Sequence, residues 1–247
     1  MNTTIVSAFI ENVFNNKDKD VNFYLERGKK LIELPYKKII FLEKNIIEYF
    51  KEYKNDNTLF VEYSKDELTS IYDIPKDIIL PQHRNKDKDT LLYLLVQNNK
   101  SEWVRKAIEL NFYDTPNYMW IDFGITHVLE KFTDKFEQIV GNCITKKYDK
   151  IRIGAINNLN LNSIYGLNLE SDDKYNYPLW FFAGGVFGGD KDHLLLFTDL
   201  CKNKLKQIIN IKKITWEVNV WYLVYLENKE LFDPYYCNHD VRILNNY

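Results

Sequence analysis

The first 65 residues alternate apolar runs with amphipathic segments, and this order constrains the fold more than any other feature of the chain. Three apolar runs predict buried strands, at residues 4–10, 38–42 and 58–63. Between them, residues 21–34 have the apolar spacing of a helix that stops at Pro35, and residues 46–53 predict a short helix. A β-α-β-α-β order predicts a parallel sheet with helices on its faces.

The remainder of the chain continues these two patterns. Further helices are predicted at residues 90–97, 101–111, 128–140, 191–209 and 216–228, and further strands at 118–122, 151–156, 179–187 and 231–236. Ser101 is a candidate N-cap for its helix. Residues 64–88 are polar and predict a loop that carries a short helix, and residues 157–177 predict a loop. The chain contains no internal repeat and no dividing linker, so a single α/β domain over residues 1–247 is predicted.

Charge and composition exclude several classes of protein. A net charge of −2 and a pI of about 6.1 give no electrostatic case for nucleic acid or anionic membranes as partners. Three scattered cysteines indicate neither a disulfide framework nor a zinc site. The chain has no signal peptide pattern and no apolar run of transmembrane length. We therefore expect a cytoplasmic protein, with peripheral attachment to a membrane left open.

Aromatic residues are abundant, with 18 tyrosines and 15 phenylalanines. The simpler explanation is the codon usage of an AT-rich genome. The alternative is a carbohydrate site, because the apolar faces of sugars pack on aromatic rings.

One predicted strand ends in a carboxylate. The apolar run at residues 118–121 stops at Asp122, and Gly124 and His127 follow. In an open α/β sheet the ligand lies at the carboxyl ends of the strands. Asp122 could therefore hold a cation or a sugar hydroxyl there. It could equally be the N-cap of a following helix.

A second cluster is rich in glycine. Four of the nine glycines lie within residues 184–189, inside and just after a predicted strand. Glycine in a strand marks a bulge or a close approach of another group to the backbone. Helix packing or a turn before residue 191 explains the cluster as well as a bound ligand does. The segment matches neither a dinucleotide-binding fingerprint nor a P-loop.

Two late residues complete the candidates. Glu217 begins a predicted helix, where it could complement the helix dipole or act as a general base toward an acceptor hydroxyl. His239 lies in a polar tail, where it could be a surface residue or a ligand for Mn²⁺ or Mg²⁺.

Taken together, these motifs resemble a GT-A-type glycosyltransferase and, more narrowly, the HtrL/YibB-type family of glycosyltransferase-like proteins. The resemblance spans most of the chain. It rests on the opening strand from Thr4 to Phe9, on Lys100 at a helix start, on Trp120-Ile121-Asp122-Phe123-Gly124, and on the glycine-rich run at residues 182–189.

The resemblance implies a single GT-A-like, Rossmann-like domain with a mixed, mostly parallel sheet flanked by helices. Residues 1–125 would be the nucleotide-binding half and residues 126–247 the acceptor-binding half. In such folds an Asp-x-Asp motif holds a metal that bridges the diphosphate. Here Asp122 is its first acid, Gly124 replaces the second, and His239 matches the late histidine that completes the site with Mn²⁺ or Mg²⁺.

The resemblance also implies roles for the other candidates. The nucleotide-sugar donor would contact the end of the first strand, Lys100 would neutralise its diphosphate, and the glycine-rich strand would face the sugars. Glu217 would be the base, with Asp122 as its catalytic partner. The residues implied at the donor site are Ala8, Phe9, Ile10, Lys100, Asp122, Gly124, Ala183, Gly184 and Gly185.

The predicted function is therefore a hexosyltransferase-type glycosyltransferase. It would move a sugar from a UDP-sugar to a glycan or lipid-linked acceptor, with a metal assisting. The first alternative is a non-catalytic sugar- or nucleotide-binding protein that retains the GT-A fold. A second, an α/β hydrolase or nucleotidase, lacks support because the chain has no Gly-x-Ser-x-Gly elbow.

Overall fold

The fold is built around one central sheet. The computed structural model of the protein describes residues 2–11, 20–159, 163–164 and 166–247. Within these ranges, seven strands form a sheet in the order β3-β2-β1-β4-β8-β5-β9. These strands are β1 (Thr3–Phe9), β2 (Lys38–Leu42), β3 (Thr58–Glu62), β4 (Asn117–Ile121), β5 (Ile151–Ala155), β8 (Phe182–Asp190) and β9 (Phe232–Tyr236). Two short strands, β6 (Ser163–Ile164) and β7 (Leu167–Asn168), form a separate hairpin.

The sheet is mostly parallel. Strands β3, β2, β1 and β4 run in one direction, and β5 pairs parallel with β9. Strand β8 is antiparallel to both of its neighbours, β4 and β5. The predicted fold class, an α/β protein with a mixed, mostly parallel sheet flanked by helices, is confirmed.

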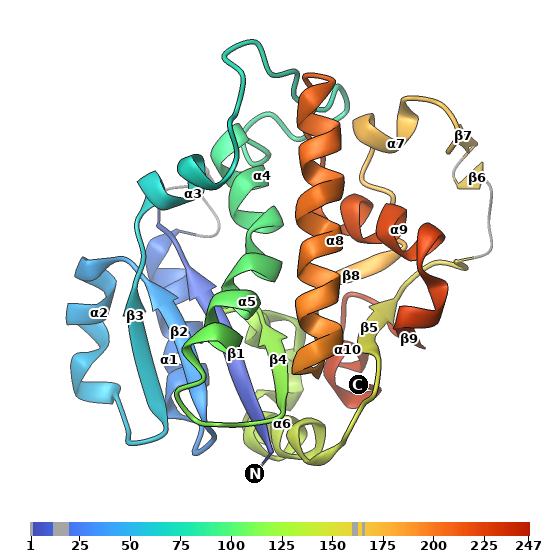
Figure 1. The fold of residues 1–247 in the computed structure, drawn as a ribbon. Helices are drawn as coiled ribbons and strands as arrows, with labels where there is room; N and C mark the ends of the chain where they lie inside the picture. The colour runs from blue at the N-terminus through green and yellow to red at the C-terminus, as the bar shows by residue number, and fades with distance from the viewer. Residues whose placement is uncertain (1, 12–19, 160–162, 165) are drawn as a thin grey trace.

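Helices cover both faces of the sheet. They are α1 (Val21–Glu33), α2 (Lys44–Phe50), α3 (Lys65–Ile71), α4 (Leu91–Asn98), α5 (Lys100–Leu110), α6 (Phe136–Thr145), α7 (Asp173–Asn176), α8 (Lys191–Asn210), α9 (Glu217–Glu227) and α10 (Arg242–Asn245). Short 3₁₀ turns connect some of them, namely η1 (Lys51–Tyr53), η2 (Ile125–Val128), η3 (Glu130–Lys135) and η4 (Lys229–Leu231). Figure 1 shows α4, α5 and α8 in front of the sheet.

Two apolar cores follow from the alternation of side chains along the strands. On β4, Tyr118 and Trp120 enter the core shared with α4, α5, α8 and α9. Met119 and Ile121, between and after them, enter the core shared with α1, α2, α6 and α10. A run of apolar residues with no polar alternation is what a strand buried on both faces requires.

Two local predictions are wrong. Ser101 is not the N-cap of α5, because Asn99 keeps helical backbone angles at the end of α4 and α5 begins directly at Lys100. The helix predicted at residues 128–140 begins only at Phe136, after the 3₁₀ turns η2 and η3. Apolar spacing of three or four residues fits both kinds of helix, so the pattern could not separate them.

The predicted loop at residues 64–88 contains α3, as expected. The division of the chain into a nucleotide-binding half, residues 1–125, and an acceptor-binding half, residues 126–247, stays a prediction.

Candidate active site

Asp122 is the first residue beyond the carboxyl end of β4. Its side chain is 35% exposed, and the indole Nε1 of Trp120 donates a hydrogen bond to Oδ1 at 2.7 Å. The backbone N–H of Asp122 donates to the carbonyl of Gly185 on β8 at 2.9 Å. The N-cap position of η2 is Gly124, with no side-chain cap bond. The alternative of Asp122 as a helix cap is therefore wrong.

Lys100 lies beneath Asp122. It opens α5, which packs against β1 and β4, and its side chain is only 4% exposed. Nζ lies 3.0 Å from Asp122 Oδ1 and 3.3 Å from Oδ2, 3.1 Å from Glu217 Oε1, and 3.0 Å from the carbonyl oxygen of Gly184. An ammonium has three donors, so these three residues match its capacity.

The charges of this cluster depend on one another. Burial disfavours a charged lysine, but the carboxylates of Asp122 and Glu217 outweigh it and raise the pKa of Lys100 above its ordinary value. With all three groups ionised, one negative charge is left uncompensated within the cluster. Asp122 is the most exposed of the three side chains, so this excess charge faces outwards.

Glu217 opens α9 at the bottom of the cluster. Its side chain is 7% exposed, and Trp216 at the N-cap makes no side-chain cap bond. The prediction that Glu217 lies in the first turn of a helix is confirmed. Its carboxylate is held by Lys100 and faces β8, which is the arrangement a buried base or a structural ion pair would each require.

The glycine-rich strand serves two purposes at different positions. A Cβ atom on Gly184 would lie 2.4 Å from Glu217 Oε1, whereas one on Gly185 would first meet the side chains of Ile125 and Ile243, at 3.0 and 3.1 Å. A Cβ on Gly188 would meet the hydroxyl of Tyr247 and the carbonyl of Tyr118 on β4, and one on Gly189 would meet the carbonyl of Lys150, just before β5, at 2.8 Å. Gly184 therefore makes room for the charged cluster, and the other three glycines allow close packing of strands and side chains.

Ala183 is fully buried and belongs to the apolar core on the α1 side of the sheet. Its methyl group therefore contributes to packing rather than to the charged cluster.

The end of β1 lies beside this cluster. Ala8 and Phe9 are half-buried, and Ile10 is buried. The ring of Phe9 stacks on Tyr24 at 5.5 Å and on Phe123 at 5.3 Å between centroids. The three residues predicted to contact a nucleotide therefore lie beside a group of stacked aromatic rings next to β4.

Gly124 is overlaid by one of these rings. A Cβ atom there would lie 2.9 Å from Cδ1 of Tyr24. Gly124, predicted to stand in place of the second acid of an Asp-x-Asp motif, therefore accommodates the Tyr24 ring.

Two tyrosines, Tyr24 and Tyr93, lie close enough to the carboxylates for the negative charge to affect their pKa values. Burial and the charge of Asp122 raise the pKa of Tyr24 to about 12, against a smaller opposing effect of Arg27. Burial, Glu217 and other nearby acids raise the pKa of Tyr93, on α4, well above its ordinary value. Both remain protonated near neutral pH. Neither was predicted as a site residue, and their spacing in the sequence offers no signal.

Trp120 was also missed as a site residue, although a signal was available. Residues two apart on a strand point to the same face, so Trp120 and Asp122 share a side of the sheet.

His239 follows β9, and its ring packs at 87° to the ring of Trp180 with 4.7 Å between centroids. Burial, then the positive charges of His127 and Lys88, lower the pKa of His239 below its ordinary value. A neutral imidazole is the form that binds metals. His127 itself lies close to Gly124, with Nδ1 2.7 Å from its carbonyl oxygen.

A metal site can be tested against these donors. Over the described part of the chain, no group of three or more His, Cys, Asp or Glu side chains is placed to hold an ion. Mg²⁺, however, is commonly held by one or two carboxylates, with substrate phosphates and water supplying the other ligands. The outward-facing Asp122 and the excess negative charge fit that kind of site. The assignment of Asp122 and His239 as ligands stays a prediction.

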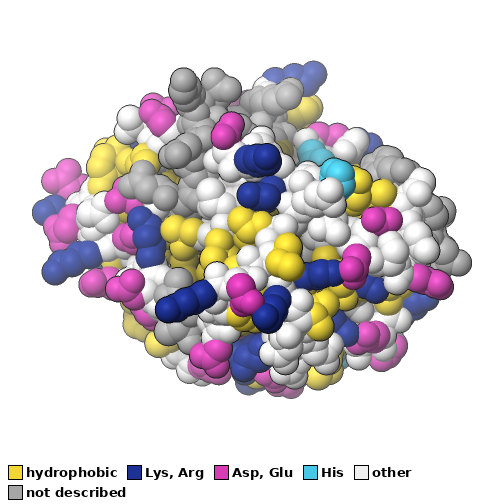
Figure 2. Space-filling model, turned by 90° about the horizontal axis from the view of Figure 1, so that it is seen from above, with side chains coloured by type: hydrophobic (Ala, Val, Ile, Leu, Met, Phe, Trp, Pro, Cys, Tyr) yellow, Lys and Arg dark blue, Asp and Glu magenta, His cyan; other side chains and the backbone are white. Residues whose placement is uncertain are grey.

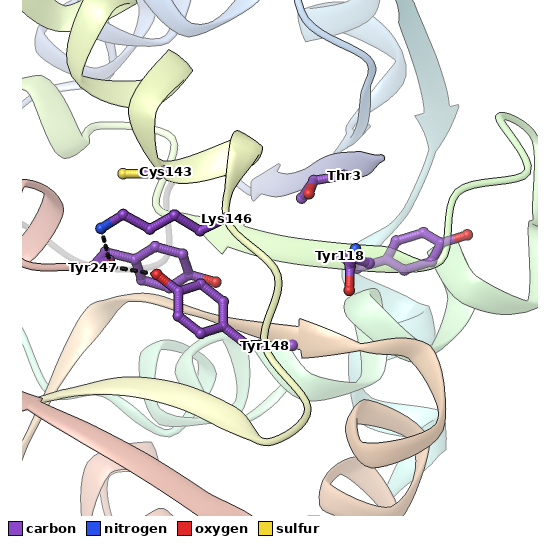
Figure 3. Close-up of a pocket in the computed structure, with 8 residues that line it drawn as sticks. Thr3, Tyr118, Cys143, Lys146, Tyr148 and Tyr247 are labelled. Atoms are coloured by element: carbon purple, nitrogen blue, oxygen red, sulfur yellow. Dashed lines mark hydrogen bonds between the residues drawn. The ribbon is translucent and has the colours of Figure 1, made fainter. Parts of the chain in front are cut away.

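The opposite end of the sheet has a small hollow of a different character. Figure 3 shows Lys146 and Tyr148 converging on Tyr247, whose carbonyl oxygen accepts hydrogen bonds from Nζ at 2.7 Å and from the phenol at 2.5 Å. Thr3 and Tyr118, from the first residues of β1 and the start of β4, also line it. These polar groups bind one another, so we place no functional site there.

The outer surface adds two observations. Figure 2, seen from above, shows apolar side chains at the middle of this face with lysines and arginines around them, and histidines to one side. None of the helices that the structure describes has the length and apolar character needed to span a bilayer.

Residues 12–239 match the model of a family described as "Bacterial protein of unknown function (HtrL_YibB)". No curated protein matches the sequence. Among solved structures, the chain is similar to a glycosyltransferase involved in the glycosylation of the major capsid of PBCV-1, with 15% identity and a TM-score of 0.43. That similarity covers 96% of this chain and 81% of the other. At this TM-score, nothing beyond the similarity follows.

Proposed function

The chain belongs to the HtrL_YibB family, and we propose that it is a glycosyltransferase of the hexosyltransferase type. It moves a sugar from a nucleotide donor, a UDP-sugar, to a hydroxyl of a glycan or lipid-linked acceptor. The observation that carries the proposal is the convergence of Asp122, Lys100 and Glu217 beside Gly184, at the carboxyl end of β4. Ligands bind at this end of open α/β sheets.

Sugar transfer with inversion needs a base for the acceptor hydroxyl and a group that orients the donor, and this cluster offers a carboxylate for each role. In an inverting reaction, Glu217 removes a proton from the acceptor hydroxyl, the hydroxyl oxygen attacks the anomeric carbon, and the bond from that carbon to the diphosphate oxygen breaks. The nucleoside diphosphate leaves with the electron pair. Asp122, whose side chain is 35% exposed, orients the donor from the other side of Lys100.

Lys100 acts as a positioning residue in this scheme. The family resemblance assigns it to the diphosphate, but its donors are already matched by Asp122, Glu217 and the Gly184 carbonyl. It therefore fixes the distance between the two carboxylates. Neutralisation of the diphosphate falls to groups nearer the surface, and Lys88 and His127 lie close enough to His239 to lower its pKa.

A divalent ion fits the same proposal. Mn²⁺ or Mg²⁺ held by Asp122 and His239 would stabilise the negative charge that develops on the leaving diphosphate. The location that we propose for this activity is the cytoplasm, with peripheral contact to a membrane where the acceptor is lipid-linked.

The test is turnover of a donor panel. Purified protein is incubated with UDP-glucose, UDP-galactose, UDP-N-acetylglucosamine and GDP-mannose, and nucleotide release is measured. At least one donor should be consumed, and Asp122→Ala should abolish the activity. Asp56→Ala, a change to an exposed aspartate in the turn before β3, should leave it intact. A panel that gives neither turnover nor a thermal shift would refute the proposal.

The alternative is a protein that binds the nucleotide or sugar without catalysis, favoured by Gly124 in place of a second acid. Calorimetry with UDP, with and without Mn²⁺, separates the two functions. Binding that is independent of metal and is accompanied by no turnover identifies the alternative.

The stereochemical course of the reaction decides whether Glu217 is needed as a base. In an inverting enzyme a base is required, so Glu217→Gln should remove most of the activity. A retaining enzyme does not need this base, and the variant would then keep substantial activity.

A further inference from the structure

We propose that the indole ring of Trp180 is the platform on which a sugar ring of the acceptor stacks. The inference rests on the proposed function and names the binding surface for its second substrate.

Trp180 has an unfavourable backbone conformation. Its φ is +51°, in the left-handed region. In the described part of the chain, the other non-glycine residues with positive φ are Asn111, Asp114 and Lys212. Asn and Asp enter this region readily, whereas a bulky side chain there is an outlier that costs free energy. Such outliers persist only where the surroundings enforce them, and they cluster at functional sites.

The surroundings of Trp180 do enforce its conformation on both sides. The N–H of Leu179 donates to Asn219 Oδ1 at 3.0 Å, and the carbonyl of Trp180 accepts from Asn157 Nδ2 at 2.8 Å. The carbonyl of Phe181 accepts from the N–H of Ile156 at 2.9 Å. Three consecutive residues are thus tied to α9 and to the end of β5.

Asn219 strengthens this hold because its amide nitrogen also donates to the carbonyls of Lys174 and Tyr177, at 2.9 and 2.7 Å. One buried side chain on α9, two residues after Glu217, therefore fixes the loop that leads to Trp180.

The ring of Trp180 remains only half-buried, although Leu179 and Phe181 on either side are buried. The ring of His239 packs at 87° to it and fixes its orientation. A large aromatic side chain that is held rigidly and left partly open is suited to the apolar face of a pyranose. The ring packs against the core without being enclosed by it, so part of its surface is open to a ligand.

The position along the chain places this ring near the proposed reaction. Trp180 precedes Gly184 by four residues, and Gly184 contacts the Lys100–Glu217 pair. Four residues span at most about 13 Å, the length of a fully extended segment. A sugar that stacks on Trp180 would therefore belong to the same acceptor as the hydroxyl beside Glu217, one or two units away. Figure 1 shows β8 and α9 side by side in this region.

The decisive variant is Trp180→Gly, because glycine adopts positive φ without strain. If the ring serves the acceptor, the Kd for saccharides should rise about tenfold, while the thermal midpoint of unfolding falls because the ring also packs against the core. Trp180→Phe should retain most of the affinity. Phe112→Ala removes another exposed aromatic, which is 59% exposed and follows Asn111 with its positive φ, and should change neither quantity.

Binding is measured by calorimetry with glucose, galactose, N-acetylglucosamine, lactose and maltose, and with UDP as the donor-side probe. Weaker saccharide binding by Trp180→Gly with an unchanged Kd for UDP supports the proposal. Equal saccharide binding by the wild type and the variant, no binding of any saccharide by the wild type, or a change in UDP binding alone overturns it. Because these measurements need no turnover, an inactive wild type would refute the proposed transferase activity without deciding the role of Trp180.

Discussion

The ammonium of Lys100 lies 3.1 Å from Oε1 of Glu217, in a pair whose side chains are 4% and 7% exposed. The two residues are 117 positions apart, one at the start of α5 and the other at the start of α9. Removing one partner of a buried ion pair leaves the other charge uncompensated, so their stability effects are coupled. The pair therefore joins two helices and holds the candidate base in one place.

Lys100→Met should destabilise the protein by about 3–5 kcal/mol, because Glu217 and Asp122 lose their common counter-ion. Lys100→Met combined with Glu217→Gln should regain part of that loss. Urea unfolding of the single and double variants measures the coupling. Lys29→Met removes an exposed lysine from an i,i+4 pair with Glu33 and should cost less than about 1 kcal/mol. A loss of that small size for Lys100→Met would contradict the buried pair.

Gly184→Ala should reduce kcat by on the order of a hundredfold, because misplacing a catalytic group by about 1 Å has effects of that size. The new methyl group would lie 2.4 Å from Glu217 Oε1 and force the carboxylate to move. Steady-state kinetics and a thermal melt separate this from unfolding. Gly141→Ala is the matched control, because its methyl group would meet the hydroxyl of Tyr36 at 2.5 Å, away from Asp122. It should lower stability and leave kcat unchanged.

Mn²⁺ should tighten UDP binding in the wild type, since the diphosphate supplies ligands that Asp122 and His239 alone do not. Asp122→Asn should remove the Mn²⁺ effect, and His239→Ala should reduce it. Calorimetry of UDP with Mn²⁺ and with a chelator gives the difference in Kd. Equal Kd values for the wild type under both conditions would show that the predicted metal is not used.

Lys38 should make stability depend on pH in the alkaline range. Its side chain is fully buried, and desolvation lowers its pKa from 10.5 to about 8. Below pH 8 both the folded and unfolded states are protonated, and the folded state carries the cost of the buried charge. Between pH 8 and 10.5 the folded protein has lost this proton while the unfolded chain retains it, so the free energy of unfolding rises with pH, by about 3 kcal/mol.

Comparison with Lys38→Met isolates this effect from the other groups that titrate at alkaline pH. Urea unfolding of both proteins from pH 7.5 to 10.5 should show the wild type gaining stability relative to the variant. A constant difference across that range would mean that the pKa of Lys38 is not lowered.

Local patterns in the sequence were sufficient for most of the fold. The apolar runs and Pro35 located the β-α-β-α-β start, and the glycine-rich run located β8 within a few residues. The antiparallel direction of β8 could not be read in this way, because a buried strand has the same apolar pattern in either direction. The boundary between η3 and α6 was not predicted for a related reason, since 3₁₀ and α helices share their apolar spacing.

The candidate site shows the same difference between what local sequence patterns predict and what the tertiary structure decides. The sequence by itself determined that Asp122 ends a strand and that Glu217 begins a helix, because strand ends and helix starts are set by local side-chain chemistry. Only the tertiary structure decided that both carboxylates share the ammonium of Lys100, that Gly184 leaves room for them, and that Trp180 is held with a positive φ. These relations join segments far apart in the chain. They depend on the order and direction of the strands, which no local pattern contains.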